Sequence, residues 1–114
     1  MKLLTQQQIW ALISNGRARI KQDGGFDPHP VVKLFTPDGA ATWLLTEIDP
    51  YHPDYAFGLC DLGMGCPELG YVSLKELAEV RGRMGLPVER DLSFKAEKPL
   101  SAYLEAALEG KHYA

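Results

Sequence analysis

The fold of this chain is decided by one stretch, which reads VVKLFT at residues 31–36, PDG at residues 37–39 and ATWLLTEID at residues 41–49. Its first segment is rich in β-branched and aromatic residues, which are typical of strands. Proline presets φ in the turn and glycine accepts a positive φ, so the turn suits a reversal of the chain. The stretch therefore predicts a β-hairpin.

Two further strands are expected a short distance along the chain. They lie at residues 55–61 (YAFGLCD) and 68–72 (ELGYV), and the intervening connections are short. A parallel return would need a crossover of about a dozen residues or more. We therefore expect four consecutive strands, each antiparallel to the one before it.

A helix is expected ahead of the hairpin. Residues 5–8 (TQQQ) have the form of a capping box, in which the Thr hydroxyl and a Gln side chain each satisfy a free backbone amide. Apolar residues then recur at helical spacing, which predicts a helix over residues 6–14 that ends at Asn15 and Gly16. Glycine and proline in residues 22–30 predict a loop there.

The rest of the chain predicts two more helices and a short strand. A second capping box at residues 73–76 (SLKE) predicts a helix over residues 74–83, residues 92–94 (LSF) read as a short edge strand, and residues 99–110 predict the last helix. The order is α-β-β-β-β-α-β-α. It predicts a single α+β domain over residues 1–114, with a mainly antiparallel four- to five-stranded sheet and helices packed on one face.

The composition restricts the classes of function. The formal net charge of −3 gives the whole chain no attraction toward phosphate backbones or anionic lipid, so binding to nucleic acid would need a local basic patch. Nowhere does the sequence hold the roughly 18 consecutive apolar residues of a membrane span. We expect a cytoplasmic protein with no membrane contact.

The two cysteines, Cys60 and Cys66, are separated by five residues. This spacing matches neither the CxxC redox motif nor the usual paired zinc knuckles. We expect reduced, structural thiols, with a disulfide across the hairpin or a metal site as the alternatives. The low cysteine count agrees with a reducing compartment.

An acidic cluster is expected where the second strand ends. Strict alternation places Glu47 and Asp49 on one face of that strand, and His52 and Asp54 follow in the adjoining loop. Carboxylates and imidazole can ligate a divalent cation or act as acid and base. The alternative is a solvated acidic strand end with an aspartate that caps the loop.

A second charged cluster is formed by Glu89, Arg90 and Asp91. A guanidinium held by a carboxylate can recognise phosphate or carboxylate in a bidentate manner, which makes the cluster a candidate site for an anionic ligand. The alternative is an ion pair that fixes how the strand enters the sheet. One arginine flanked by two acids has little charge to spare for an anion.

A candidate basic patch follows the first helix, at Arg17, Arg19 and Lys21. If these residues shared a side of the molecule with the basic residues of the second helix region, they would form a modest phosphate-binding surface. The alternative is a solvated helix surface. The residues of that second group are Lys75, Arg81 and Arg83.

Several segments together resemble one small bacterial family, catalogued as a domain of unknown function (family 2958). The segments are VKLFTP at 32–37, Trp43 with TEID at 46–49, FGL at 57–59, ELGYVSLKEL at 68–77 and LPVERDLSF at 86–94. The resemblance covers residues 30–104, and members of the family occur on conjugative plasmids, integrative elements and phages. It implies a cytosolic accessory protein of mobile DNA and carries no established activity, so no catalytic residue follows from it.

Three functions remain as hypotheses. Nucleophile elbows, HExxH and paired CxxC motifs are absent from the sequence, so we assign no catalytic residue, metal or cofactor. The first hypothesis is a protein-interaction module that binds another protein through a sheet face or edge that no helix covers. The alternatives are nucleic-acid binding through Arg17, Arg19 and Lys21, and a small metal-dependent hydrolase that uses Glu47, Asp49 and His52. The oligomeric state stays open.

Overall fold

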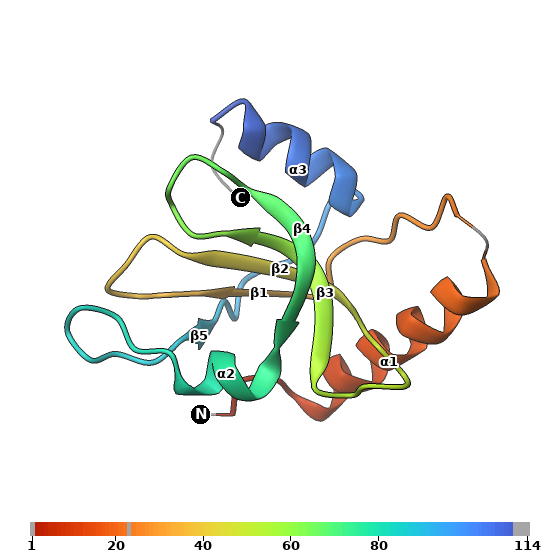
Figure 1. The fold of residues 1–114 in the computed structure, drawn as a ribbon, viewed down its shortest axis with the longest axis horizontal. Helices are drawn as coiled ribbons and strands as arrows, with labels where there is room; N and C mark the ends of the chain where they lie inside the picture. The colour runs from red at the N-terminus through yellow and green to blue at the C-terminus, as the bar shows by residue number, and fades with distance from the viewer. Residues whose placement is uncertain (1, 23, 111–114) are drawn as a thin grey trace.

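The computed structural model describes residues 2–22 and 24–110 and has the predicted α+β architecture (Figure 1). Its elements follow one another in the predicted order. They are α1 (Gln6–Lys21), β1 (Val32–Phe35), β2 (Thr42–Ile48), β3 (Tyr55–Asp61), β4 (Glu68–Ser73), α2 (Leu74–Glu79), β5 (Glu89–Arg90) and α3 (Leu100–Leu108). In this part of the chain no helix has the length and apolar character needed to cross a membrane.

The five strands form one open antiparallel sheet in the order β4-β3-β2-β1-β5. The four-stranded meander is confirmed, and β5 joins it at the β1 edge. The edge strand itself is Glu89–Arg90, so the prediction of a strand at residues 92–94 is wrong. The chain turns at Asp91, whose carboxylate accepts a hydrogen bond from the Ser93 backbone at 2.9 Å, and Phe94 then packs against α3.

Helix α1 begins at the predicted capping box but ends at Lys21, about two turns past its predicted end at residue 14. Gly16 does not stop the helix. A Cβ at Gly16 would collide with the backbone carbonyl of Ile48, so the glycine lets α1 approach the sheet closely. Asn15 contributes to the same contact, since its side-chain amide donates to the Thr46 carbonyl at 2.8 Å. The predicted end at Asn15 and Gly16 is therefore wrong because both residues serve packing.

The helices cover both faces of the sheet, which corrects the expectation that they share one face. Helices α1 and α2 contribute Leu12 and Leu77 to one apolar core. Helix α3 contributes Leu100 and Tyr103 to a second core, on the other face, as the position of α3 in Figure 1 illustrates. The reason lies in the central strand β2, whose residues are almost all buried, so the sheet has two apolar faces to cover.

A β-bulge interrupts strand β2 and changes which residues share a face. The pairing with β3 shifts register between Leu45 and Glu47. Beyond the bulge Ile48 joins Leu45 in the core beneath α1, whereas Glu47 lies opposite Phe57, which packs on the α3 side. The strict alternation predicted for this strand, which would keep Glu47 on the face of Trp43 and Leu45, is wrong at this point, because the extra residue of a bulge inverts the alternation.

The second helix is shorter than predicted, whereas the loop between the first helix and the hairpin lies where it was predicted. Helix α2 ends at Glu79 because Val80 adopts an extended conformation, so residues 80–83 are not helical. In the loop predicted at residues 22–30, residue 23 lies outside the described residues, and residues 22 and 24–30 form no helix or strand, as predicted. Hydrogen bonds join this loop to α3. Asp27 accepts hydrogen bonds from the backbone and hydroxyl of Ser101, and the Pro28 carbonyl accepts one from the Leu100 backbone at 3.0 Å.

Candidate functional site

Strand β4 forms one edge of the sheet, and no strand of the described chain pairs with its outer side. The Leu74 backbone donates to the Asp54 carbonyl at 2.8 Å, which extends the β3–β4 ladder by one pair. Alternate pairs of an antiparallel ladder exchange hydrogen bonds. The even-numbered residues of β4 therefore bond to β3, and Leu69 and Tyr71 direct their backbone N–H and C=O groups outward.

The β4 edge carries little protection against pairing with another strand. Natural edge strands are commonly blocked by lysine, by proline or by very short length. The six residues of β4 include neither lysine nor proline, and the one charged residue, Glu68, is the first of the strand. The opposite edge, β5, has only two residues. Leu69 and Tyr71 are also 42% and 54% exposed, so an apolar surface lies along the open edge.

An apolar groove of about 660 Å³ lies on one side of the β4 edge. A Cβ added at Gly70 would meet nothing within 4 Å, so the groove is open above this residue. Both cysteines are free thiols and lie in its wall, and burial together with Glu68 raises the pKa of Cys60. The groove is lined by Trp43, Cys60, Leu62, Met64, Cys66, Glu68, Leu69, Gly70, Tyr71 and Val72.

An acidic pocket of about 230 Å³ lies at the other side of Tyr71. The Tyr71 ring packs edge-on against Phe57, with the ring centroids 5.1 Å apart. Burial raises the pKa of the Tyr71 hydroxyl, and the negative charges of Glu47 and Asp49 raise it further. The pocket is lined by Gly16, Arg19, Ile20, Glu47, Asp49, Pro50, Tyr51 and Tyr71.

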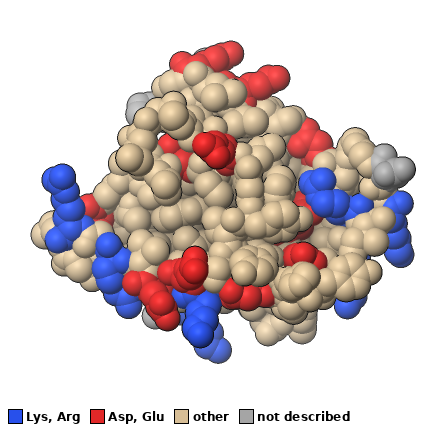
Figure 2. Space-filling model, viewed as in Figure 1, with Lys and Arg blue, Asp and Glu red and all other residues tan. Residues whose placement is uncertain are grey.

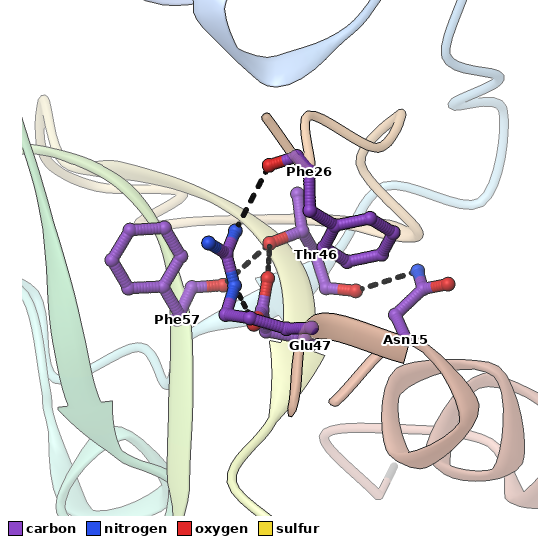
Figure 3. A network of polar contacts seen from close by, with 6 residues as sticks. Asn15, Phe26, Thr46, Glu47 and Phe57 are labelled. Carbon is purple, nitrogen blue, oxygen red and sulfur yellow. Dashed lines mark hydrogen bonds and ion pairs between the residues drawn. The ribbon is translucent and has the colours of Figure 1, made fainter. Parts of the chain in front are cut away.

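Glu47 is 2% exposed and forms an ion pair with Arg19 of α1. Figure 3 shows Glu47 beside Thr46, whose hydroxyl lies 3.1 Å from one carboxylate oxygen. The Arg19 guanidinium lies between two aromatic rings, 5.2 Å from the centroids of both Phe26 and Phe57. Every charge of this network has a partner, so the network fastens α1 to the bulge.

The predicted acidic cluster is only partly assembled. Glu47 and Asp49 border one pocket, but His52 does not line it and instead pairs with Asp49 at 3.4 Å on the surface. A hydrogen bond from the Tyr51 backbone lowers the pKa of Asp49. Asp54 accepts hydrogen bonds from Ser73 Oγ and the Lys75 backbone at the start of α2. Among residues 2–22 and 24–110, no three His, Cys, Asp or Glu side chains are grouped to hold a metal ion.

Two residues of the second charged cluster, Arg90 and Asp91, bind other groups of the same chain. Arg90 donates to the carbonyl oxygens of Lys2 and Leu3 at 2.8 and 3.2 Å, so it holds the N-terminal segment. Asp91 forms an ion pair with Lys33 at 3.5 Å between Nζ and Oδ2. The three residues Glu89, Arg90 and Asp91 border one shallow depression of about 500 Å³.

The candidate basic patch is divided. Arg19 turns inward to Glu47, while Arg17 and Lys21 are exposed on α1. On the face seen in Figure 2, basic residues gather at the margins, and acidic residues lie between them. This face presents no continuous basic surface.

The fold and the site define a small α+β protein whose sheet edge at β4 is flanked by an apolar groove and an acidic pocket. The chain belongs to the family described as "Protein of unknown function (DUF2958)", whose model matches residues 3–112. The matched range extends at both ends beyond residues 30–104, over which the sequence showed the resemblance. No curated protein and no solved structure matches the chain.

Proposed function

We propose that this chain is a protein-binding module that accepts an extended segment of a partner protein as an additional strand along β4. The observation that carries the proposal is the set of backbone N–H and C=O groups that Leu69 and Tyr71 direct away from the sheet. Each hydrogen bond formed by an added strand contributes about 0.5–1.5 kcal/mol net. The neighbouring apolar groove offers surface that the same segment can bury.

The charges around the edge favour a protein over a nucleic acid. Binding to a phosphate backbone depends on several free cations on one surface. Arg19 is neutralised by Glu47, and the Tyr71 hydroxyl experiences the negative charges of Glu47 and Asp49. A phosphate chain would be repelled at this edge.

The family resemblance supplies the setting of the proposal. The resemblance implies that members of the family occur on conjugative plasmids, integrative elements and phages, and we propose that the module acts in the bacterial cytosol as an accessory protein of mobile genetic elements. The partner is then a protein that is present in cells that carry such an element.

A nuclease-treated pull-down tests the proposal. The tagged chain is expressed in cells that carry the element encoding it, and wild type is compared with Leu69→Lys, which puts a charge on the open edge. Leu86→Lys is the matched control, because Leu86 is 41% exposed against 42% for Leu69 and lies three residues before β5, the opposite edge strand.

We expect a stoichiometric partner protein that survives nuclease, is lost with Leu69→Lys and is retained with Leu86→Lys. Retention of the partner by Leu69→Lys would reject the β4 edge as the binding surface. Loss of all bound material on nuclease treatment would transfer the function to nucleic-acid binding.

A further inference from the structure

We propose that the strand received by β4 carries a basic residue directly beside an apolar one, with the Lys or Arg over Tyr71 and the apolar side chain in the groove over Gly70. This inference rests on the proposed function and specifies the chemistry of its partner. It follows from the two different surfaces on the two sides of the edge.

The alternation of a strand sets which partner residue meets which surface. Neighbouring side chains of an added strand point to opposite faces, and each lies beside the β4 residue with which it pairs. Val72 packs into the core beneath α1, so Gly70 faces that side as well. Tyr71 packs on Phe57 and faces the α3 side. Two adjacent residues of the partner therefore contact Gly70 and Tyr71 from opposite faces.

The pocket beside Tyr71 favours a positively charged side chain on the added strand. Two carboxylates, Glu47 and Asp49, border the pocket together with one guanidinium, that of Arg19, which leaves one negative charge in excess. His52 beside Asp49 adds a positive charge only when it is protonated. A Lys or Arg side chain here would gain both the carboxylate field and a cation–π contact with the half-exposed Tyr71 ring.

The groove above Gly70 favours an apolar side chain on the added strand. Because glycine leaves the space above its Cα open, a side chain from the added strand can enter the groove. Trp43 and the thiol of Cys60 lie in its wall, and the exposed side chains of Leu62 and Met64 border it. Burial of a Val or Leu side chain in such a site is favourable in proportion to the apolar area removed from water.

The charges on the wider surface around β4 also favour a basic partner segment. In Figure 2, the middle of the face, where β4 lies in front in Figure 1, is mostly uncharged, and the charged residues nearest to it are mainly acidic. A second copy of β4 would not satisfy this surface, since Glu68–Ser73 contains one acidic residue and no basic one. The occupant we infer is therefore a different, basic protein segment.

Selection from a displayed library of random dodecapeptides tests the inference. The wild-type chain should enrich sequences with Lys or Arg next to an apolar residue. Asp49→Asn keeps an acceptor for the Tyr51 backbone but removes one negative charge, so a selected peptide should bind about threefold to tenfold more weakly to it. Glu79→Gln removes the same charge from α2, on the other face, and should bind the peptide like wild type.

A second variant isolates the groove. Gly70→Val fills the open space above the strand and should remove the enrichment of large apolar residues, while Lys and Arg stay enriched. Circular dichroism of each variant establishes that it is folded before selection.

Enrichment of neutral or acidic residues, the absence of any selected sequence, or equal weakening by Asp49→Asn and Glu79→Gln would overturn the inference. So would a dimer of the chain, detected by sedimentation, that Leu69→Lys dissociates. The proposed function is decided separately by the pull-down. A partner that is lost with Leu69→Lys but lacks a basic residue in its bound segment would leave that function standing and reject only this inference.

Discussion

The two edges of the sheet are built in opposite ways. The β5 edge is two residues long, and Arg90 ties it to the carbonyl groups of the N-terminal segment. The β4 edge is six residues long and holds no lysine or proline, and the nearby Arg19–Glu47 ion pair joins α1 to β2, with Glu47 buried and Arg19 partly exposed. The side chain that holds the β5 edge lies on the edge strand itself, whereas the ion pair near β4 lies behind the edge strand and leaves the outer side of β4 unpaired in the part of the chain that the structure describes.

Loss of the Arg19–Glu47 ion pair should destabilise the fold strongly. Arg19→Ala leaves the Glu47 carboxylate buried without its cation, which should lower the free energy of unfolding by about 3 kcal/mol. Urea denaturation of both proteins measures this loss. The double variant Arg19→Leu with Glu47→Leu should recover most of it, because no charge is then left buried. A loss below about 1 kcal/mol for Arg19→Ala would contradict the role given to the ion pair.

A smaller effect is expected at the opposite edge. Arg90→Ala removes hydrogen bonds to two backbone carbonyls, one exposed and one partly buried, which should cost about 1 kcal/mol in the free energy of unfolding. Hydrogen exchange should show faster exchange in the N-terminal residues and no change in β4. Exchange in β4 that rises as much as in the N-terminal segment would show that Arg90 does not act locally at the β5 edge.

The thiols of the groove give a chemical measure of the β4 side. Burial and Glu68 raise the pKa of Cys60, whereas Cys66 is exposed. Because the thiolate is the reactive form, iodoacetamide at pH 8 should modify Cys66 about tenfold faster than Cys60. Mass spectrometry of peptides resolves the two rates. Equal rates would show that the groove does not shield Cys60.

The smallest effect concerns pH. Hydrogen bonds from Ser73 and from the Lys75 backbone lower the pKa of Asp54, at the end of β4 where α2 begins. The unfolded chain then binds more protons between the two pKa values, so stability is fully present above the unfolded value of about 3.8 and is lost as pH falls through the folded value. Asp54→Asn should show a shallower loss of stability between pH 4 and pH 2 in urea denaturation. An unchanged slope would contradict this assignment.

Local sequence signals predicted most of the elements of the fold. The predicted bounds of β3 match, and the capping box at Thr5 and Gln8 is confirmed. The same local reasoning failed at Asn15 and Gly16, because a glycine that ends a helix and a glycine that lets a helix approach a sheet look alike in sequence. Only the backbone of Ile48, distant along the chain, distinguishes the two.

The contacts of the site were less predictable, because they too join residues that are far apart in the sequence. The Arg19–Glu47 ion pair joins residues 28 positions apart, and the bulge that turns Glu47 toward Phe57 leaves no local signal. One signal was present in the sequence. A carboxylate inside the apolar strand 42–48 must find a buried partner, which favours a nearby arginine over an open metal site. The expected open edge is found in the structure, whereas the binding itself stays a proposal.

The position of α3 has a consequence for the synthesis of the chain. Leu44 and Leu59 are fully buried in a core that α3, which comes last in the described chain, completes with Leu100 and Tyr103. During translation the sheet can form on α1 while its second face still lies open to water. This face is a place where a nascent chain would attract chaperones or aggregate until α3 emerges and docks onto it.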